Sequence, residues 1–198
     1  MVYAAALDIS KAFDTVRHDK LMSKLLQAGI PRWITNLGLL SNWYSKLHVA
    51  VRWNGSLSNF RVSSGVRQGC ILSPALFNMY INQLIVDLCE CGSGCHVNNC
   101  FVGCLFYADD IILLSTSVAG LHNLLNVCDL SVLDLSLKFN CRKSQCIAFG
   151  PKYDFEVDDM LLGSNTISWC SSLKYLGLTL LSGQSVAVDD ALIKRKFY

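Results

Sequence analysis

Two adjacent aspartates between two apolar segments constrain the fold of this chain more than any other feature. The segment FYADD occupies residues 106–110 and ends in Asp109 and Asp110. Apolar residues 104–105 precede it and residues 111–114 follow it. Short apolar runs that are bounded at both ends are typical of buried strands. The acidic pair is therefore expected at the turn of a hairpin.

Two adjacent carboxylates at a tight turn repel one another. A divalent cation would neutralise the pair, and carboxylate oxygens are the ligands that Mg²⁺ prefers. This interpretation predicts a magnesium site and phosphoryl chemistry. Aspartate is also frequent at solvated turns, so a turn without a metal is the alternative that these residues alone leave open.

The composition predicts one domain, with at most a small appendage, in a chain of 198 residues. Hydrophobic residues make up 52% and charged residues only 16%, which is apolar for a soluble protein and predicts faces that further segments cover. No run reaches the roughly 18 apolar residues of a membrane-spanning helix, so no membrane association is expected. The N-terminus lacks the pattern of a secretory signal, which predicts an intracellular protein, in the nucleus or the cytoplasm.

Net charge and cysteine content add little about function. The formal charge of +2 and the pI near 8 are low for a free-standing nucleic-acid binder, so charge alone does not indicate DNA or RNA. Five of the ten cysteines lie within residues 89–104, together with His96. Their spacing matches no zinc-ligand pattern, so reduced thiols are the expectation and a zinc site is the alternative.

Periodicity predicts an α+β fold in which helices cover one face of an antiparallel sheet. The turn signals Asn54-Gly55 and Ser73-Pro74 mark a hairpin and a helix start. The expected strands are residues 2–9, 47–53, 57–62, 104–105, 111–114 and 145–149, and the expected helices are 18–28, 33–44, 73–88 and 118–137. A final hairpin is expected over residues 167–180, turning at Ser171-Ser172, and the structure from Leu181 onward is left open.

In this plan Asp8 ends the first strand next to the central hairpin. It can then face Asp109 across the sheet, although a hundred residues separate the two in sequence. Carboxylates that converge in this way suit a pair of Mg²⁺ ions about 3.5–4 Å apart, which catalyse in-line displacement at phosphorus.

Five segments of the chain resemble, in order, the motifs of reverse transcriptases from non-LTR (LINE-like) retrotransposons. The fourth motif departs in one place, because Ser136 stands where the family often has glycine. The segments are LDISKAFD at residues 7–14, GVRQGCILSP at 65–74 with LFN at 76–78, FYADD at 106–110, LKFN at 137–140 with Lys143-Ser144, and LKYLG at 173–177.

The resemblance implies an RNA-directed DNA polymerase that extends a DNA primer on an RNA template with deoxynucleoside triphosphates. It implies that Asp8, Asp109 and Asp110 are catalytic and hold two Mg²⁺ ions, with Mn²⁺ as a substitute. Lys143 would act as the general acid toward pyrophosphate.

The resemblance also assigns binding roles. Lys11, Ala12 and Phe13 would bind the nucleotide, with Phe13 excluding a 2′-hydroxyl group, and Gln68 and Gly69 would join them. The residues that would contact template or primer are Arg67, Tyr175, Leu176 and Gly177.

The family fold implied is a polymerase palm with a ferredoxin-like core over residues 1–165. Residues 166–198 would form a primer-grip hairpin and the start of a truncated thumb. Most of the fingers would be missing, so fingers and thumb segments from elsewhere are expected partners. Two alternatives stay open: a catalytically silent retroelement remnant or interaction module, and an RNA-dependent RNA polymerase palm, against which Phe13 argues.

Overall fold

The computed structural model describes residues 1–35, 38–154 and 157–189. The chain forms two compact units. The first unit comprises Met1–Ser10, Leu84–Leu133 and the chain from Lys138 onward, and the second comprises Lys11–Gln83 and Asp134–Leu137. The predicted boundary between residues 165 and 166 falls inside a short strand, and the assignment of a palm core and a thumb start stays a prediction.

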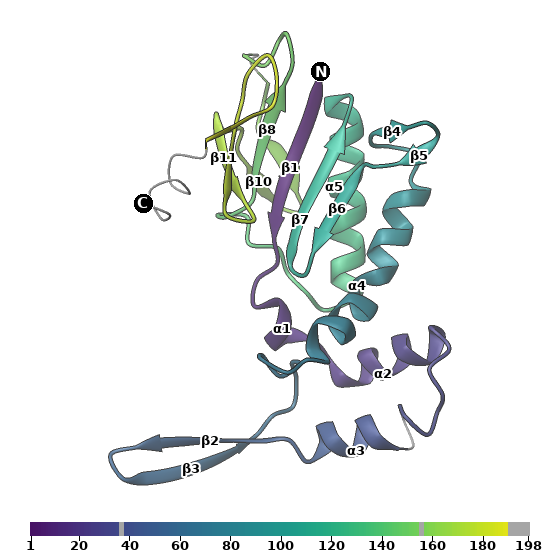
Figure 1. Cartoon of the computed structure of the whole chain (residues 1–198), viewed down its shortest axis with the longest axis vertical. Helices are drawn as coiled ribbons and strands as arrows, with labels where there is room; N and C mark the ends of the chain where they lie inside the picture. The colour runs from purple at the N-terminus through teal and green to yellow at the C-terminus, as the bar shows by residue number, and fades with distance from the viewer. Residues whose placement is uncertain (36–37, 155–156, 190–198) are drawn as a thin grey trace. The chain divides into compact units, whose positions relative to one another are not determined.

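A four-stranded antiparallel sheet forms the centre of the first unit (Figure 1). Its strand order is β6-β7-β1-β8, and β1 therefore pairs with β7 on one side and with β8 on the other. The strands are β1 (Val2–Asp8), β6 (Cys104–Tyr107), β7 (Asp110–Ser115) and β8 (Gln145–Phe149). All four lie where the apolar runs predicted strands, because each run is too apolar to remain in contact with water.

The two faces of this sheet bury different partners. Figure 1 shows the helix α5 (Val118–Asp134) and the part of α4 (Ser73–Glu90) from Leu84 onward on one side of the sheet. On the other face Ala4, Ile112 and Ile147 form a buried cluster with Leu173 of a later strand. Because side chains alternate along a strand, this second face is also the one that Asp8 and Asp110 share.

Both long helices have the expected positions, but α5 is shorter than predicted. It ends at Asp134 rather than at Leu137. Ser136 has a φ of +57°, a left-handed conformation that cannot continue an α-helix. Among the described residues, the structure contains no helix with the length and apolarity that a membrane crossing requires.

The C-terminal strands of the first unit differ from the single hairpin that was expected. That prediction is wrong, because residue 167 ends one hairpin and residues 172–181 form the next. The later hairpin turns at Leu176-Gly177, not at Ser171-Ser172, and both turn residues have positive φ, +48° and +80°. Such a turn matches the natural twist of paired strands, and glycine favours it. The strands are β9 (Met160–Leu162), β10 (Asn165–Ile167), β11 (Ser172–Tyr175), β12 (Leu178–Leu181) and β13 (Ala187–Asp189); a small ribbon of β4 (His96–Val97) and β5 (Cys100–Phe101) also belongs to this unit.

The second unit contains short helices and a two-stranded ribbon. The ribbon pairs β2 with β3 and turns at Asn54-Gly55, as predicted. The prediction that a helix begins at Trp33 is wrong. Ile34 donates its N–H to the carbonyl of Pro31 in a turn, and the helix begins only at Leu39. The elements are α1 (Ala12–Thr15), α2 (His18–Gln27), α3 (Leu39–Ser45), β2 (His48–Trp53) and β3 (Ser56–Arg61), followed by the start of α4.

Candidate active site

The register of the central sheet places Asp8 directly opposite Asp110. These two residues are the last pair in the ladder between β1 and β7. The Cβ atoms of such opposed residues lie about 4.5–5.5 Å apart, and the two side chains share one face. Ala108 and Asp109 form the two-residue turn that joins β6 to β7, with Ala108 at a φ of +55°. The first unit therefore brings Asp8 next to the acidic hairpin, as predicted, but opposite Asp110 and not Asp109, because Asp109 lies in the turn.

The electrostatics of Asp110 show how crowded the negative charge is at this place. The pKa of Asp110 is raised, first by burial and then by the carboxylates of Asp109 and Asp8. Lys143 opposes this shift, and its Nζ lies 3.6 Å from Oδ1 of Asp8. Among the described residues, no three His, Cys, Asp or Glu side chains are close enough together to form a ready-made metal cage.

The backbone of Asp8 is fastened to the loop that carries Lys143. The N–H of Asp8 donates to Oγ of Ser144 (3.2 Å), and the Ser144 hydroxyl donates to the carbonyl of Asn140 (3.0 Å). The N–H of Asn140 in turn donates to the carbonyl of Asp8 (2.8 Å). Ser144 is buried, so this hydroxyl cannot exchange its partners for water. Sequence reasoning gave Ser144 no role, and its only signal was its position after Lys143.

Tyr175 connects the C-terminal hairpin to the carboxylate face. Its side chain packs against the buried cluster of that face. Burial raises the pKa of Tyr175, and the charge of Asp110 raises it further. Leu176 and Gly177 form the exposed turn beyond it. Of the residues predicted for template or primer, Tyr175 is thus the one held near a predicted metal ligand.

In the second unit, the predicted nucleotide-binding residues Lys11, Ala12 and Phe13 surround the start of α1. Lys11 has a φ of +49°, and its carbonyl accepts the N–H groups of Asp14 and Thr15. Ala12 is buried. The ring of Phe13 stacks on the buried ring of Phe77, with the ring centroids 4.9 Å apart, which fixes its orientation.

The predicted residues Arg67, Gln68 and Gly69 lie in an exposed loop before α4. Nε2 of Gln68 donates to Oδ1 of Asp14 (3.1 Å), and the hydroxyl of Ser73 donates to the carbonyl of Arg67 (2.6 Å). Arg67, Gln68 and Asp14 line the same hollow of about 520 Å³.

Gly65 allows this loop to approach α1 so closely. A Cβ atom at Gly65 would lie 2.9 Å from the carbonyl oxygen of Asp14, so no other residue fits there without displacing the backbone. The second and first predicted motifs thus meet within the second unit.

Comparisons with known proteins agree with these motifs. The family described as "Reverse transcriptase (RNA-dependent DNA polymerase)" matches residues 2–180. The Pol polyprotein of the type-2 retrotransposable element R2DM of Drosophila melanogaster is 30% identical over 200 residues, which cover 96% of this chain and 18% of that protein. An R2 Pol polyprotein of Nasonia vitripennis is 31% identical over 155 residues, covering 76% of this chain and 14% of that protein. The chain therefore spans less than a fifth of the length of these relatives.

Solved structures show the same fold. A telomerase of Candida tropicalis, truncated from the C-terminal domain, matches with a TM-score of 0.61 and 17% identity, over 95% of this chain and 35% of that one. Telomerase of Candida albicans, in complex with the TWJ fragment of telomeric RNA, matches with a TM-score of 0.60 and 15% identity, over 95% and 31% of the two chains. These structures share an α+β fold of the polymerase-palm type. The chain belongs to the reverse transcriptase family, as a domain of the non-LTR retrotransposon kind.

Proposed function

We propose that this chain is the catalytic palm of an RNA-directed DNA polymerase. Asp8, Asp109 and Asp110 hold two Mg²⁺ ions in this proposal, and Mn²⁺ can replace them. The observation that carries it is the pairing of Asp8 with Asp110 at the end of the sheet, beside the turn that contains Asp109. This pairing joins two motifs that are a hundred residues apart.

The donor set suits divalent cations. The carboxylates are acceptor-only groups. Burial, and after it the charges of Asp109 and Asp8, raise the pKa of Asp110, and Lys143 offsets this only in part. When bound, two such ions activate the primer 3′-hydroxyl and stabilise the leaving pyrophosphate. The hydrogen bonds to Ser144 and from Asn140 fix the backbone of Asp8. The strand register then places its side chain on the same face as that of Asp110.

Lys143 serves in this proposal as the proton donor to the leaving pyrophosphate. Its side chain is 68% exposed, and its one ion pair among the described residues is with Asp8 at 3.6 Å. A lysine in this state can leave Asp8 and reach a phosphate without breaking a buried contact. The loop bonds of Asn140 and Ser144 keep its backbone beside Asp8.

The binding roles in the second unit follow from the family resemblance. Lys11 and Ala12 offer backbone amides to the triphosphate, and Phe13 blocks a 2′-hydroxyl with a ring that Phe77 holds in place. Gln68 and Gly69 contact nucleotide and template, and Arg67 contacts template phosphate. The hydrogen bond from Gln68 to Asp14 holds the loop of residues 67–69 beside α1, which supports these binding roles.

The finer fold assignment belongs to the same proposal. The elements β1, α4, β6, β7, α5 and β8 follow the βαββαβ order of a ferredoxin-like core. The hairpin of β11 and β12, with Tyr175, Leu176 and Gly177, acts as the primer grip. The core then covers residues 1–165, and residues 166–198 comprise the grip and the thumb start, of which 190–198 lie outside the described residues.

Primer extension tests the proposal. The full chain is incubated with an RNA template, a DNA primer, deoxynucleotides and Mg²⁺, and compared with Asp109→Asn. The variant is expected to lose at least about a thousandfold in rate, because a bound metal contributes several kcal/mol to the transition state. Asp154→Asn is the matched control, since Asp154 is exposed and outside the motifs.

Two outcomes contradict the proposal. Equal incorporation by the chain and by Asp109→Asn removes the metal role of the hairpin. The second outcome has two parts. The unchanged chain incorporates no nucleotide with Mg²⁺ or Mn²⁺, and calorimetry shows that the chain and Asp8→Ala bind Mg²⁺ equally. This result favours a catalytically silent remnant.

A further inference from the structure

Charge is divided unevenly between the two units. The second unit has nine Lys and Arg against three Asp, a formal charge of +6, whereas the first has eight against twelve, a charge of −4. Between Asp19 and Asp87 the sequence contains no acidic residue at all. The overall charge of +2 hides this difference.

The ribbon of β2 and β3 sorts its residues onto two unlike faces. Every residue of both strands is exposed. Because His48 pairs with Arg61, and side chains alternate along a strand, His48, Arg52 and Arg61 share one face. The opposite face carries Val49, Val51, Trp53 and Phe60, with Ser56 and Ser58 beside them. The first face contains every charged residue of the ribbon, together with Ala50, Leu57 and Asn59. We call the face with His48, Arg52 and Arg61 the basic face.

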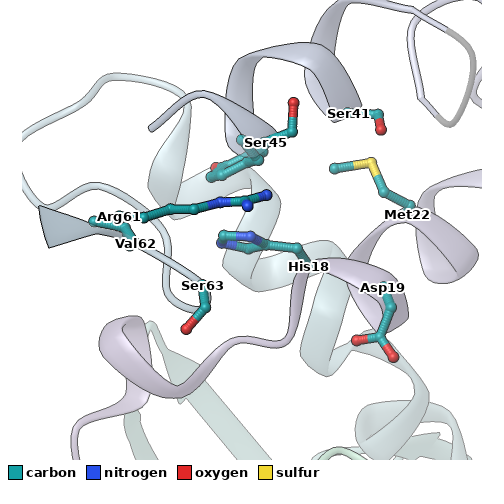
Figure 2. Close-up of a pocket in the computed structure, with 9 residues that line it drawn as sticks. His18, Asp19, Met22, Ser41, Ser45, Arg61, Val62 and Ser63 are labelled. Atoms are coloured by element: carbon teal, nitrogen blue, oxygen red, sulfur yellow. The ribbon is translucent and has the colours of Figure 1, made fainter. Parts of the chain in front are cut away.

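A pocket of about 580 Å³ lies where the basic face ends (Figure 2). This volume is within the roughly 300–1,000 Å³ of ligand sites in proteins. Figure 2 shows Arg61 extending from the end of β3 across the pocket toward His18. The wall also contains the hydroxyl groups of Ser41, Ser45 and Ser63. None of the residues predicted to bind nucleotide, template or primer lines this pocket.

The charges at the pocket favour an anion. Asp19 is its acidic residue, but Arg17 already neutralises it through an ion pair with an N–O distance of 2.5 Å. The ion pairs of the described residues do not include Arg61. Arg61 therefore brings an uncompensated positive charge into a pocket lined by hydroxyl groups.

Two aromatic rings give the pocket a fixed wall. The rings of His18 and Tyr44 lie 4.5 Å apart, and Tyr44 is buried. Nε2 of His18 is 2.8 Å from the carbonyl of Gly65, so it is the ring nitrogen that donates. Arginine and hydroxyl donors beside a fixed ring are the groups that contact phosphate and sugar in nucleic-acid complexes.

We propose that this pocket and the basic face bind the phosphodiester backbone of a single nucleic-acid strand, with Arg61 contacting a phosphate. The strand lies along His48 and Arg52 and enters the pocket at Arg61. The binding uses no residue of the proposed metal site, so it goes beyond the polymerase function and does not depend on it. Serine and arginine donors serve RNA and DNA backbones alike.

Fluorescence anisotropy of the full chain with a short labelled single-stranded RNA, and with DNA of the same sequence, tests this proposal. Arg61→Gln is expected to weaken binding about tenfold, because it removes one charge-assisted phosphate contact. The dependence of log affinity on log salt concentration should become shallower by about 0.7, the value for one phosphate contact on a single strand. Ser63→Asp, which adds a negative charge to the pocket, should weaken binding as well.

Arg32→Gln is the matched control, since Arg32 is an exposed cation of the same acid-free stretch and does not line this pocket. Equal weakening by Arg32→Gln and Arg61→Gln overturns the proposal, because it shows diffuse attraction only. Full competition by a nucleoside monophosphate also overturns it, in favour of a free-nucleotide site. The anisotropy assay contains no Mg²⁺ and no deoxynucleotide, so a failure of this proposal and a failure of the polymerase proposal appear in separate measurements.

Discussion

The two units of this chain carry net charges of opposite sign. In the first unit, Asp8, Asp109 and Asp110 lie at one end of a sheet whose buried side chains are mostly apolar. In the second, exposed cations are spread over a ribbon and a pocket with few acids near them. Concentrated negative charge suits metal ions and chemistry, and distributed positive charge suits a polyanion.

The units also differ in how much of their structure is buried. The strands β1, β7 and β8 contain residues with no exposure, such as Ala5, Leu113 and Ile147. The ribbon of β2 and β3 has none. The predicted metal ligands therefore lie on strands that a packed core holds in place. The ribbon proposed to bind a nucleic-acid strand is exposed to water.

The largest expected effect concerns this difference in packing. Ile147→Ala in the first unit should lower the free energy of unfolding by about 2–5 kcal/mol, because it leaves a cavity at a fully buried position. Val51→Ala on the exposed ribbon should change it by no more than about 0.5 kcal/mol. Urea unfolding followed by circular dichroism measures both, and similar losses would show that the ribbon is packed after all.

The next prediction asks whether the second unit selects the sugar. Phe13→Ala should raise the use of ribonucleotides relative to deoxynucleotides at least about tenfold, or about 1.4 kcal/mol, because it removes the ring that Phe77 holds. Competitive primer extension measures this ratio, with Phe60→Ala on the ribbon as control. An unchanged ratio would show that Phe13 does not exclude the 2′-hydroxyl group, and it would favour the alternative of an RNA-dependent RNA polymerase palm.

A smaller effect is expected at the end of α5. Ser136→Gly should raise the free energy of unfolding by about 1 kcal/mol, because a non-glycine residue is strained at a φ of +57°. Thermal unfolding measures the change. Ser172→Gly, at an exposed position of strand β11, is the control and should lower stability instead.

The smallest effect depends on pH. The raised pKa of Asp110 means that its charged form destabilises the fold, so its contribution is favourable in acid and is lost as the pH rises through the folded pKa. Asp110→Asn should therefore raise the free energy of unfolding slightly at neutral pH, by at most about 1 kcal/mol after solvent screening, as thermal unfolding at several pH values measures. The gain should vanish below the ordinary aspartate pKa of about 3.9. A gain that is equal at all pH values would rule out the electrostatic cause.

Local signals in the sequence were sufficient for most elements. The turn at Asn54-Gly55 and the start of α4 at Ser73 were predicted, because turn and helix-start chemistry depends on a few neighbouring residues. The C-terminal hairpin was misplaced because Ser171-Ser172 resembles a turn, whereas Leu176-Gly177 supplies the positive φ that a tight hairpin needs. The predicted helix start at Trp33 was wrong, because an apolar pattern alone does not determine where a helix begins.

The sequence by itself determined the family, the central strands and the acidic pair, because motifs and apolar runs are properties of neighbouring residues. Only the tertiary structure decided which distant residues meet. It paired Asp8 with Asp110, fastened Asp8 to Ser144, and turned His48, Arg52 and Arg61 onto one face. The physical reason is register: a shift of one residue in a strand pairing moves every side chain to the opposite face, and long-range packing sets that register.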